Sequence, residues 1–445
     1  MARTVVGATS SSPEEIRRVF FASIVGTIIE WYDFLLYGIA AALIFNKLFF
    51  PEQDPLSGTL TAFATYTVGF VVRPFGGIFF GHLGDRIGRK NVLMMTVLLM
   101  GVATTVVGLL PTYAQIGAWA AVLLTLVRVV QGFGAGAEFA GAAIMMVEYA
   151  PEHRRGLYGS WSQVGVALGL IAAFGVNALV SSLAGDQLLA WAWRIPFLLS
   201  FLLVIVAIYI RSRLLDTPVF RELQAENKLA KAPLMEVLRV APRGLLTVLG
   251  ARFADNAVFN VGLVFVLAYA AQHVQITSTI SLTGIFIGSI VQAVLIPFCG
   301  ALSDLVGRRW VYGGACFLGA IFAFPFFWMV DTGSPPIIWL AIAILVGVIY
   351  SGMAGPQPAY FAEQFDARFR YSGVAGGREV GAIIGGLVPL MATALLRATH
   401  SGWPEALLLA GMCVVSLVSV ILGPETFERR FRRPETAPAA SPLPP

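Results

Sequence analysis

The stretch GHLGDRIGRK at residues 81–90 follows a long apolar segment, and a weaker copy, GALSDLVGRR, stands at residues 300–309. The two copies begin 219 residues apart and share the pattern Gly-x3-Asp-x2-Gly-Arg followed by a basic residue. Glycines permit a tight turn between two helices, and the carboxylate of Asp85 can face a helix N-terminus, where negative charge is favoured. The repeated stretch predicts a chain made of two related helical halves.

The sequence around both copies is strongly apolar, with 57% hydrophobic and 12% charged side chains among 445 residues. A soluble domain carries about 25% charged residues, and about 20 apolar residues suffice to cross a bilayer. We therefore expect an all-α membrane protein with twelve transmembrane helices. The predicted spans are residues 19–44, 58–80, 91–110, 116–148, 157–182, 190–210, 244–270, 280–300, 310–330, 336–358, 371–396 and 403–422.

Two further landmarks repeat at nearly the same offset. The offset is 215 residues between the pairs Glu148–Arg155 and Glu363–Arg370, and 216 between the sets Gln163, Gly165, Gly169 and Glu379, Gly381, Gly385. Duplicated six-helix halves around a central site are an architecture of secondary transporters. The expected parts are an N-terminal tail (1–18), an N-terminal six-helix half (19–210), a central loop (211–243), a C-terminal six-helix half (244–423) and a disordered tail (424–445).

Basic residues are distributed unevenly between the loops. With an even number of spans both termini share one side, and that side carries 23 of the 30 Lys and Arg residues. The opposite side has only Lys47, Arg194 and Arg397. Because cytoplasmic loops collect Lys and Arg, we expect both termini, the central loop and both tails in the cytoplasm.

Several function classes are excluded by what the sequence lacks. The net charge of +5 is too diluted by apolar sequence to indicate nucleic-acid binding. There is no Gly-x4-Gly-Lys-Ser/Thr loop for ATP, and the four histidines form no cluster with carboxylates that would indicate a metal site. We expect no enzyme activity, metal or cofactor, and a proton gradient as the energy source.

The loop motif, its copy and RVVQG at residues 128–132 resemble the signatures of the major facilitator superfamily. Within that superfamily, EWYDF at 30–34, RPFGG at 73–77, WRIPF at 193–197 and DTPVF at 216–220 resemble the metabolite:proton symporter family. The resemblance implies alternating access in the inner membrane of a bacterium. It also implies import, with protons, of a small organic acid or zwitterion such as shikimate, α-ketoglutarate, citrate, proline or betaine. The charged pair at residues 378–379 departs from the family pattern. We expect a monomer.

Nine ionisable residues fall inside the predicted spans, and each would cost about 2.5–3.5 kcal/mol at mid-helix if left unpaired. They are Glu30, Asp33, Arg73, Arg128, Glu138, Arg252, Asp255, Arg378 and Glu379. They must pair, become neutral or face water. In the first span Ser23, Gly26, Thr27, Glu30, Asp33 and Tyr37 follow the 3–4 spacing of one helix face. We expect that polar face to point into the protein.

For proton coupling, one hypothesis is that Asp33, with Glu30 as a second candidate, gains and loses a proton while Arg128 is its cationic partner. Substrate competing for Arg128 would then link binding to protonation. The alternative is a permanent buried ion pair that joins spans one and four.

The candidate substrate contacts are polar or aromatic residues of the spans. Arg252 either pairs with Asp255 at i+3 or meets an anionic substrate. Arg378 and Glu379 lie about 100° apart on a helix and are not expected to pair with each other, so each must find another helix or the cavity. The remaining candidates, for which packing is the alternative, are Trp31, Tyr32, Arg128, Gln131, Gln163 and Asn256.

The resemblance also implies a latch that closes the cytoplasmic side when the cavity faces outward. Its first-half members would be Gly81, Asp85, Arg86, Arg89, Glu148 and Arg155, with Arg89 and Arg155 reaching Glu148. A weaker latch in the second half would use Asp304, Arg308, Glu363 and Arg370. The alternative is simple anchoring of these basic loops in the cytoplasm.

Three functions therefore remain from the sequence. The first is a proton-coupled importer of a small carboxylated or zwitterionic metabolite, which the four intramembrane arginines favour. The second is a proton-driven exporter of drugs or metabolites on the same fold. The third is a channel or a membrane enzyme.

Overall fold

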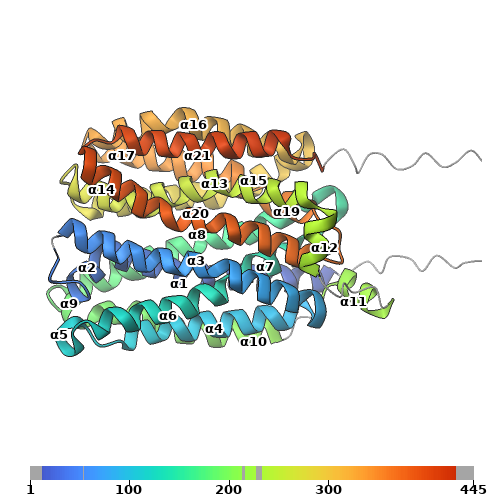
Figure 1. The fold of residues 1–445 in the computed structure, drawn as a ribbon, viewed down its shortest axis with the longest axis horizontal. Coiled ribbons are helices and arrows are strands. Elements are labelled where there is room, and N and C mark those ends of the chain that lie inside the picture. Colours follow the sequence, from blue (N-terminus) through green and yellow to red (C-terminus); the bar gives the residue numbers. More distant parts are fainter. Residues whose placement is uncertain (1–12, 54, 213–215, 227–232, 427–445) are drawn as a thin grey trace, which may run out of the picture.

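The computed structural model describes residues 13–53, 55–212, 216–226 and 233–426. Within these residues twelve helices are long and apolar enough to cross a membrane, and each overlaps one predicted span. Figure 1 shows them running side by side, with the first half in blue to green and the second in yellow to red. The predicted all-α membrane fold is confirmed.

The first six spans are formed by the helices up to Ser212, and four of the six consist of more than one element. The elements are α1 Pro13–Ala40, η1 Ala41–Phe45 and α2 Asn46–Leu48 (span one), α3 Pro55–Ile87, α4 Arg89–Leu109, α5 Tyr113–Ile116, α6 Trp119–Ala135 and α7 Glu138–Tyr149 (span four), η2 Glu152–Arg154 and α8 Arg155–Ala184, α9 Gln187–Ala190, and η3 Ala192–Arg194 and α10 Ile195–Ser212.

The connection between the halves contains two short helices, and six more spans follow. The elements are α11 Pro218–Ala225, α12 Pro233–Val240, α13 Pro242–Asn260, η4 Val261–Phe265 and α14 Val266–Gln272 (span seven), α15 Ser278–Val306, α16 Arg308–Asp331, α17 Pro335–Ile342, η5 Ala343–Ile349, α18 Tyr350–Ala354 and α19 Gln357–Ala362 (span ten), α20 Arg370–Thr399, and α21 Trp403–Leu422.

The boundaries of the parts differ slightly from those expected. α1 begins at Pro13, within the expected tail 1–18, and α10 continues to Ser212, which takes Arg211 out of the expected loop. The expected C-terminal tail 424–445 lies outside the described residues beyond Thr426. In Figure 1, α11 and α12 lie at one end of the helices and α2, α5 and α9 at the other; we call these the α12 end and the α2 end.

The internal duplication extends to irregularities of the helices. Spans one and seven both change to a five-residue π-helix, η1 and η4. Span four, expected to be continuous, breaks after Ala135, and span ten breaks after Ala354. Gly136 at the first break lies against α3, where an added Cβ would meet the backbone of Arg73 and Gly77. The break therefore occurs where α3 and the end of α6 are in close backbone contact.

Two helix pairs hold the halves together along their length. α3 packs against α20, and α8 packs against α15. The outer surfaces carry exposed apolar side chains such as Phe75 (65% exposed) and Trp328 (66% exposed). Because lipid tails are as apolar as these side chains, such surfaces fit a bilayer. Most charged side chains of the spans are buried inside the protein.

Candidate functional site

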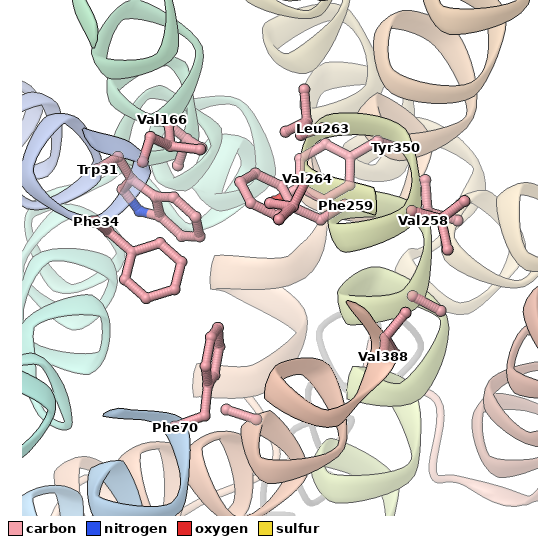
Figure 2. Packing of buried hydrophobic residues seen from close by; sticks show 14 of the residues in the cluster. Trp31, Phe34, Phe70, Val166, Val258, Phe259, Leu263, Val264, Tyr350 and Val388 are labelled. Atoms are coloured by element: carbon pink, nitrogen blue, oxygen red, sulfur yellow. The ribbon is translucent and has the colours of Figure 1, made fainter. Parts of the chain in front are cut away.

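A small cavity lies between the two halves. From the first half it is lined by Trp31, Phe34, Phe70 and Arg73, and from the second half by Arg252, Asp255, Asn256, Phe259, Asn260 and Tyr350. Figure 2 shows Trp31 and Phe34 on one side, facing Phe259 and Tyr350 on the other. The sequence placed Trp31, Arg252 and Asn256 among the substrate contacts, and all three line this cavity.

Aromatic rings form the apolar walls of the cavity. The ring of Trp31 lies 4.8 Å from that of Phe259, which closes one side across the two halves. Phe34 and Phe70 meet edge to face at 5.0 Å. The indole N–H of Trp31 has no hydrogen-bond partner among the described residues, so this wall also presents one free donor.

Two arginines from opposite halves provide the positive charge. Arg252 forms an ion pair with Asp255, and its Nη2 donates to Asn256 Oδ1 at 2.8 Å. The Arg73 guanidinium lies 4.5 Å from the Phe34 ring centroid, and its Nη1 lies 3.8 Å from Glu379 Oε2. Nε and Nη2 of Arg73 have no hydrogen-bond partner among the described residues. The sequence counted Arg73 as an intramembrane charge but did not assign it to the site.

Asp33 and Arg128 do not form the expected direct ion pair. Asp33 accepts a 2.6 Å hydrogen bond from Ser200, because this part of α1 faces α10. Arg128 donates to Gln131, and its guanidinium lies 4.3 Å from the Tyr37 ring. Gln131 donates in turn to Thr104 at 2.8 Å. Neither residue lines the cavity, so Arg128 and Gln131 lie behind its aromatic wall.

Three other predicted site residues also lie outside the cavity lining: two candidate substrate contacts and one candidate for proton coupling. Tyr32 donates to the carbonyl of Pro196 at 2.8 Å and is buried. This agrees with the alternative considered from the sequence, in which Tyr32 has a packing role. Gln163 donates to Gln357 of the other half at 3.2 Å. Glu30 is buried, and both of its carboxylate oxygens lack a hydrogen-bond partner in the described part of the chain.

The expectation that Arg378 and Glu379 would not pair is wrong, since they form an ion pair with each other. The guanidinium carbon of Arg378 lies 3.7 Å from the Phe139 ring centroid. Packing against this ring from the first half directs the long side chain back around α20 to its neighbour. Helix spacing gives the direction of the Cα–Cβ bonds, whereas the position of an arginine guanidinium depends on the groups that it packs against.

One buried ion pair was not anticipated. Glu138 accepts from Arg211 and, at 2.8 Å, from Thr96. The sequence placed Arg211 in a loop, and only the last turn of α10 carries it into the protein. Among the described residues no three His, Cys, Asp or Glu side chains gather as a metal site would require.

At the α12 end, the two repeated loops join the halves in the same way. Asp85 accepts from the backbone N–H and the hydroxyl of Ser372, at 3.0 and 2.8 Å, at the start of α20. Asp304 accepts from the backbone N–H groups of Gly156 and Leu157, at 2.9 and 2.8 Å, at the start of α8. Each carboxylate therefore caps a helix N-terminus of the opposite half, where negative charge is stabilising.

The glycines of the two loops explain the turn that follows each aspartate. Gly88 and Gly307 have φ values of 100° and 106°, which favour glycine over residues with a side chain. Gly81 lies close to α20, where a Cβ would be 3.3 Å from Ser372 Cα. Arg86 is exposed and makes its recorded contact with His82 of its own helix, so the structure places it outside the gate.

Ion pairs reinforce these caps. Glu148 accepts from Arg89 of the first half at 3.2 Å and from Arg370 of the second half at 2.8 Å. Arg155, which the sequence directed to Glu148, instead lies 4.0 Å from Glu152. In the second half, Arg308 pairs with Asp304 at 2.7 Å and with Glu363 at 3.5 Å. The second-half aspartate thus also pairs with the arginine of its own loop motif, although that loop is the weaker copy.

The halves also touch on the other side of the cavity. Thr67 donates to the carbonyl of Gly386 at 2.7 Å, and Tyr66 donates to Asn260 at 3.1 Å. At the α2 end, exposed Arg397 donates to Ser57 at 2.9 Å. The cavity is therefore bounded by contacts between the halves in both directions along the helices.

Comparisons with known proteins agree with this architecture. Residues 19–243 match the family described as Sugar (and other) transporter, and residues 245–444 match the Major Facilitator Superfamily. The shikimate transporter of Escherichia coli K12 is 38% identical over 91% of this chain and 94% of its own. The proline/betaine transporter of Salmonella typhimurium LT2 is 33% identical over 96% of this chain and 87% of its own.

The fold is also similar to solved structures. The proton:xylose symporter XylE, bound to 6-bromo-6-deoxy-D-glucose, matches with a TM-score of 0.72 at 15% identity, covering 93% of this chain and 97% of the other. The predicted resemblance is confirmed, and the chain is a multi-pass membrane protein and not an enzyme. This protein belongs to the major facilitator superfamily, as a secondary transporter of metabolites.

Proposed function

We propose that this protein is a proton-coupled symporter that imports a small organic acid or zwitterionic metabolite by alternating access. The observation that carries the proposal is the placement of Arg73 and Arg252, one from each half, on one aromatic-lined cavity. A ligand held by both arginines joins the halves at their centre. Its presence therefore changes which contacts between the halves are favourable.

The polar groups of the cavity favour an acceptor-rich ligand. Among the residues that the structure describes, the donors without a partner are Nε and Nη2 of Arg73, Nε of Arg252 and Nε1 of Trp31, whereas Asp255 contributes one acceptor oxygen without a partner. A carboxylate satisfies guanidinium donors in pairs. The names of the relatives, shikimate and proline/betaine transporters, suggest small carboxylated probes.

The contacts at the two ends support alternating access. We take the α12 end as cytoplasmic because Lys and Arg collect there. Breaking the caps of Asp85 and Asp304 would open the cavity toward the cytoplasm. Breaking the Arg397–Ser57 contact would open it toward the opposite side of the membrane. We place both termini in the cytoplasm of a bacterium and the protein, as a monomer, in the inner membrane. A 36% identical relative is the inner membrane metabolite transport protein YhjE of Escherichia coli.

The remaining predicted residues receive roles that fit their positions. Asp33, Glu30 and Arg128 stay the candidates for proton coupling. Gln131, Gln163, Arg378 and Glu379 form the polar surroundings of the cavity rather than its lining.

The test combines a thermal-shift screen of the purified protein with uptake into proteoliposomes. Shikimate, proline and glycine betaine are screened beside xylose, and we expect a carboxylated probe to stabilise the protein. Arg73→Gln should abolish that shift, whereas the matched control Arg221→Gln, at an exposed position of α11, should keep it. Uptake should collapse when a protonophore is added. Stabilisation by xylose alone, or proton-driven efflux in place of uptake, would refute the proposal.

A further inference from the structure

Six ionisable side chains gather between the cavity and the α12 end. They come from five spans and comprise Glu30, Glu138, Glu379, Arg73, Arg211 and Arg378, which we call the central ion cluster. With all six ionised, its three negative and three positive charges cancel. Uncompensated charge is expensive inside a membrane protein, so any charge added to this cluster must be balanced.

The three acids of the cluster are held very differently. Glu138 accepts from Arg211 with both oxygens and from Thr96. Glu379 pairs with Arg378 and lies near Arg73. Glu30 is only 2% exposed, and neither of its carboxylate oxygens has a hydrogen-bond partner in the described ranges. A buried carboxylate without donors is the one that most readily takes up a proton.

Arg73 belongs to the cluster and to the cavity at once. It lines the cavity, its Nη1 lies 3.8 Å from Glu379 of the other half, and it interacts electrostatically with Glu30. An anion bound to Arg73 therefore takes positive charge from the acids of the cluster. One added negative charge leaves the cluster one positive charge short.

Resting on the proposed function, we propose that Glu30, and not Asp33, carries the coupled proton. When the carboxylate of a monoanionic substrate binds Arg73, one proton from the water on the open side of the cavity adds to the carboxylate of Glu30. The cluster and ligand together are then neutral. After reorientation the substrate leaves, Arg73 returns to the acids, and Glu30 releases its proton to the other side. One anion and one proton cross together, with no net charge moved.

The charged groups around Glu30 support this assignment, and they come from four other helices. Arg73 comes from α3, Glu138 from α7, Arg211 from α10 beside Gly26, and the pair Arg378–Glu379 from α20. In α8 and α4 the ionisable residues stand only near the first turn, namely Arg155, Tyr158, Arg89 and Lys90. No further charge from those two helices faces Glu30.

Asp33 is placed differently on the same helix. Its hydrogen-bond partners are the hydroxyls of Ser200 and Thr104, it forms no ion pair among the described residues, and it does not line the cavity. It therefore has no arginine that substrate could remove. Substrate binding changes the charge beside Glu30 and leaves the immediate partners of Asp33 as they were.

The experiment compares Glu30→Gln with Asp33→Asn in proteoliposomes, with radiolabelled shikimate as the probe. The matched control is Glu405→Gln, because Glu405 is also a buried glutamate whose carboxylate oxygens lack partners among the described residues, but it lies on α21 away from the cavity. One proton per anion predicts about tenfold accumulation for each unit of pH gradient. This accumulation should not change when valinomycin clamps the membrane potential.

We expect wild type and Glu405→Gln to accumulate the probe about tenfold per pH unit. Glu30→Gln should lose accumulation, with a ratio of about one, yet keep exchange of internal for external probe, and Glu30→Asp should restore part of the accumulation. Accumulation retained by Glu30→Gln and lost by Asp33→Asn would overturn the assignment. So would loss of exchange together with accumulation in Glu30→Gln, because that marks a structural role.

A second measurement separates failure of this inference from failure of the proposed function. If wild type itself shows no proton-driven accumulation, the proposed function fails. A pH titration followed by infrared spectroscopy still reports on Glu30, because it needs no transport. Glu30→Gln should remove one titrating carboxyl band from the wild-type spectrum. A spectrum that Glu30→Gln leaves unchanged would overturn the assignment of the proton to Glu30.

Discussion

The two aspartate caps at the α12 end predict how strongly the gate is held closed. In Asp304→Asn the side chain keeps its shape and can still accept a hydrogen bond, but it loses the charge that two backbone N–H groups and Arg308 now face. Asp85→Asn makes the same change at the related position, where the donors belong to Ser372. Both variants weaken contacts that exist only while the halves meet at this end.

The magnitude follows from the number of bonds. A hydrogen bond to a charged group is worth about 1.5–3 kcal/mol and a neutral one about 0.5–1.5 kcal/mol. Asp85→Asn can keep both bonds as weaker neutral ones, because both donors reach the single oxygen Oδ2. Asp304→Asn loses one bond, because its two donors reach different oxygens and an amide nitrogen cannot accept. The loss is about 1–3 kcal/mol. The open population should therefore rise about 5- to 150-fold. Asp304→Asn should have the larger effect, because it also weakens the pairing of Arg308.

The assay is a distance measurement by pulsed electron spin resonance. Spin labels at the exposed positions Ile87 and Trp310 lie at the ends of facing halves, after replacement of the native cysteines. Both variants should shift the distribution toward longer distances, and the double variant should shift it further, whereas Asp186→Asn at an exposed position should not. Distributions identical to wild type in both single variants would refute the assignment of these caps to the gate.

Two further predictions concern stability, both read from thermal unfolding in detergent. Gly132→Ala should lower the free energy of unfolding by about 1–3 kcal/mol, because its Cβ would clash with the backbone carbonyl of Gly69. Gly175→Ala, with open space around it, should be neutral or stabilising; equal effects would contradict the close packing of α3 and α6. Arg211→Ala should lower the free energy of unfolding by about 3–5 kcal/mol, because it leaves the buried carboxylate of Glu138 without its arginine. Adding Glu138→Gln should recover part of this loss of stability. A melting temperature of Arg211→Ala equal to that of wild type would contradict the pairing.

The number of spans and the general location of the site could be predicted from the sequence, because both follow from local patterns. Long apolar segments identify the spans, and the 3–4 spacing around Glu30 identifies an inward face. The cavity does contain Trp31, Arg252 and Asn256, as the polar and aromatic positions suggested. The pairing of charges could not be predicted, because each arginine has several acids within reach.

The partners that differ show the reason. Arg128 was expected to reach Asp33 and instead contacts Gln131, and Arg378 was expected to avoid Glu379 and instead pairs with it. A flexible arginine side chain is directed by the rings it packs on, here Tyr37 and Phe139, which come from other helices. Sequence spacing contains no information about those neighbours.

By itself, the sequence determined a twelve-helix membrane protein in two related halves with ionisable groups inside, since hydropathy and repetition are properties of residues along the chain. The tertiary structure alone decided that Arg73 faces the cavity, that Glu148 joins Arg89 to Arg370, and that no donor in the described part of the chain reaches Glu30. These features depend on which helices of opposite halves lie side by side, and the energy of a buried charge depends on the groups within a few ångströms rather than on its neighbours in sequence.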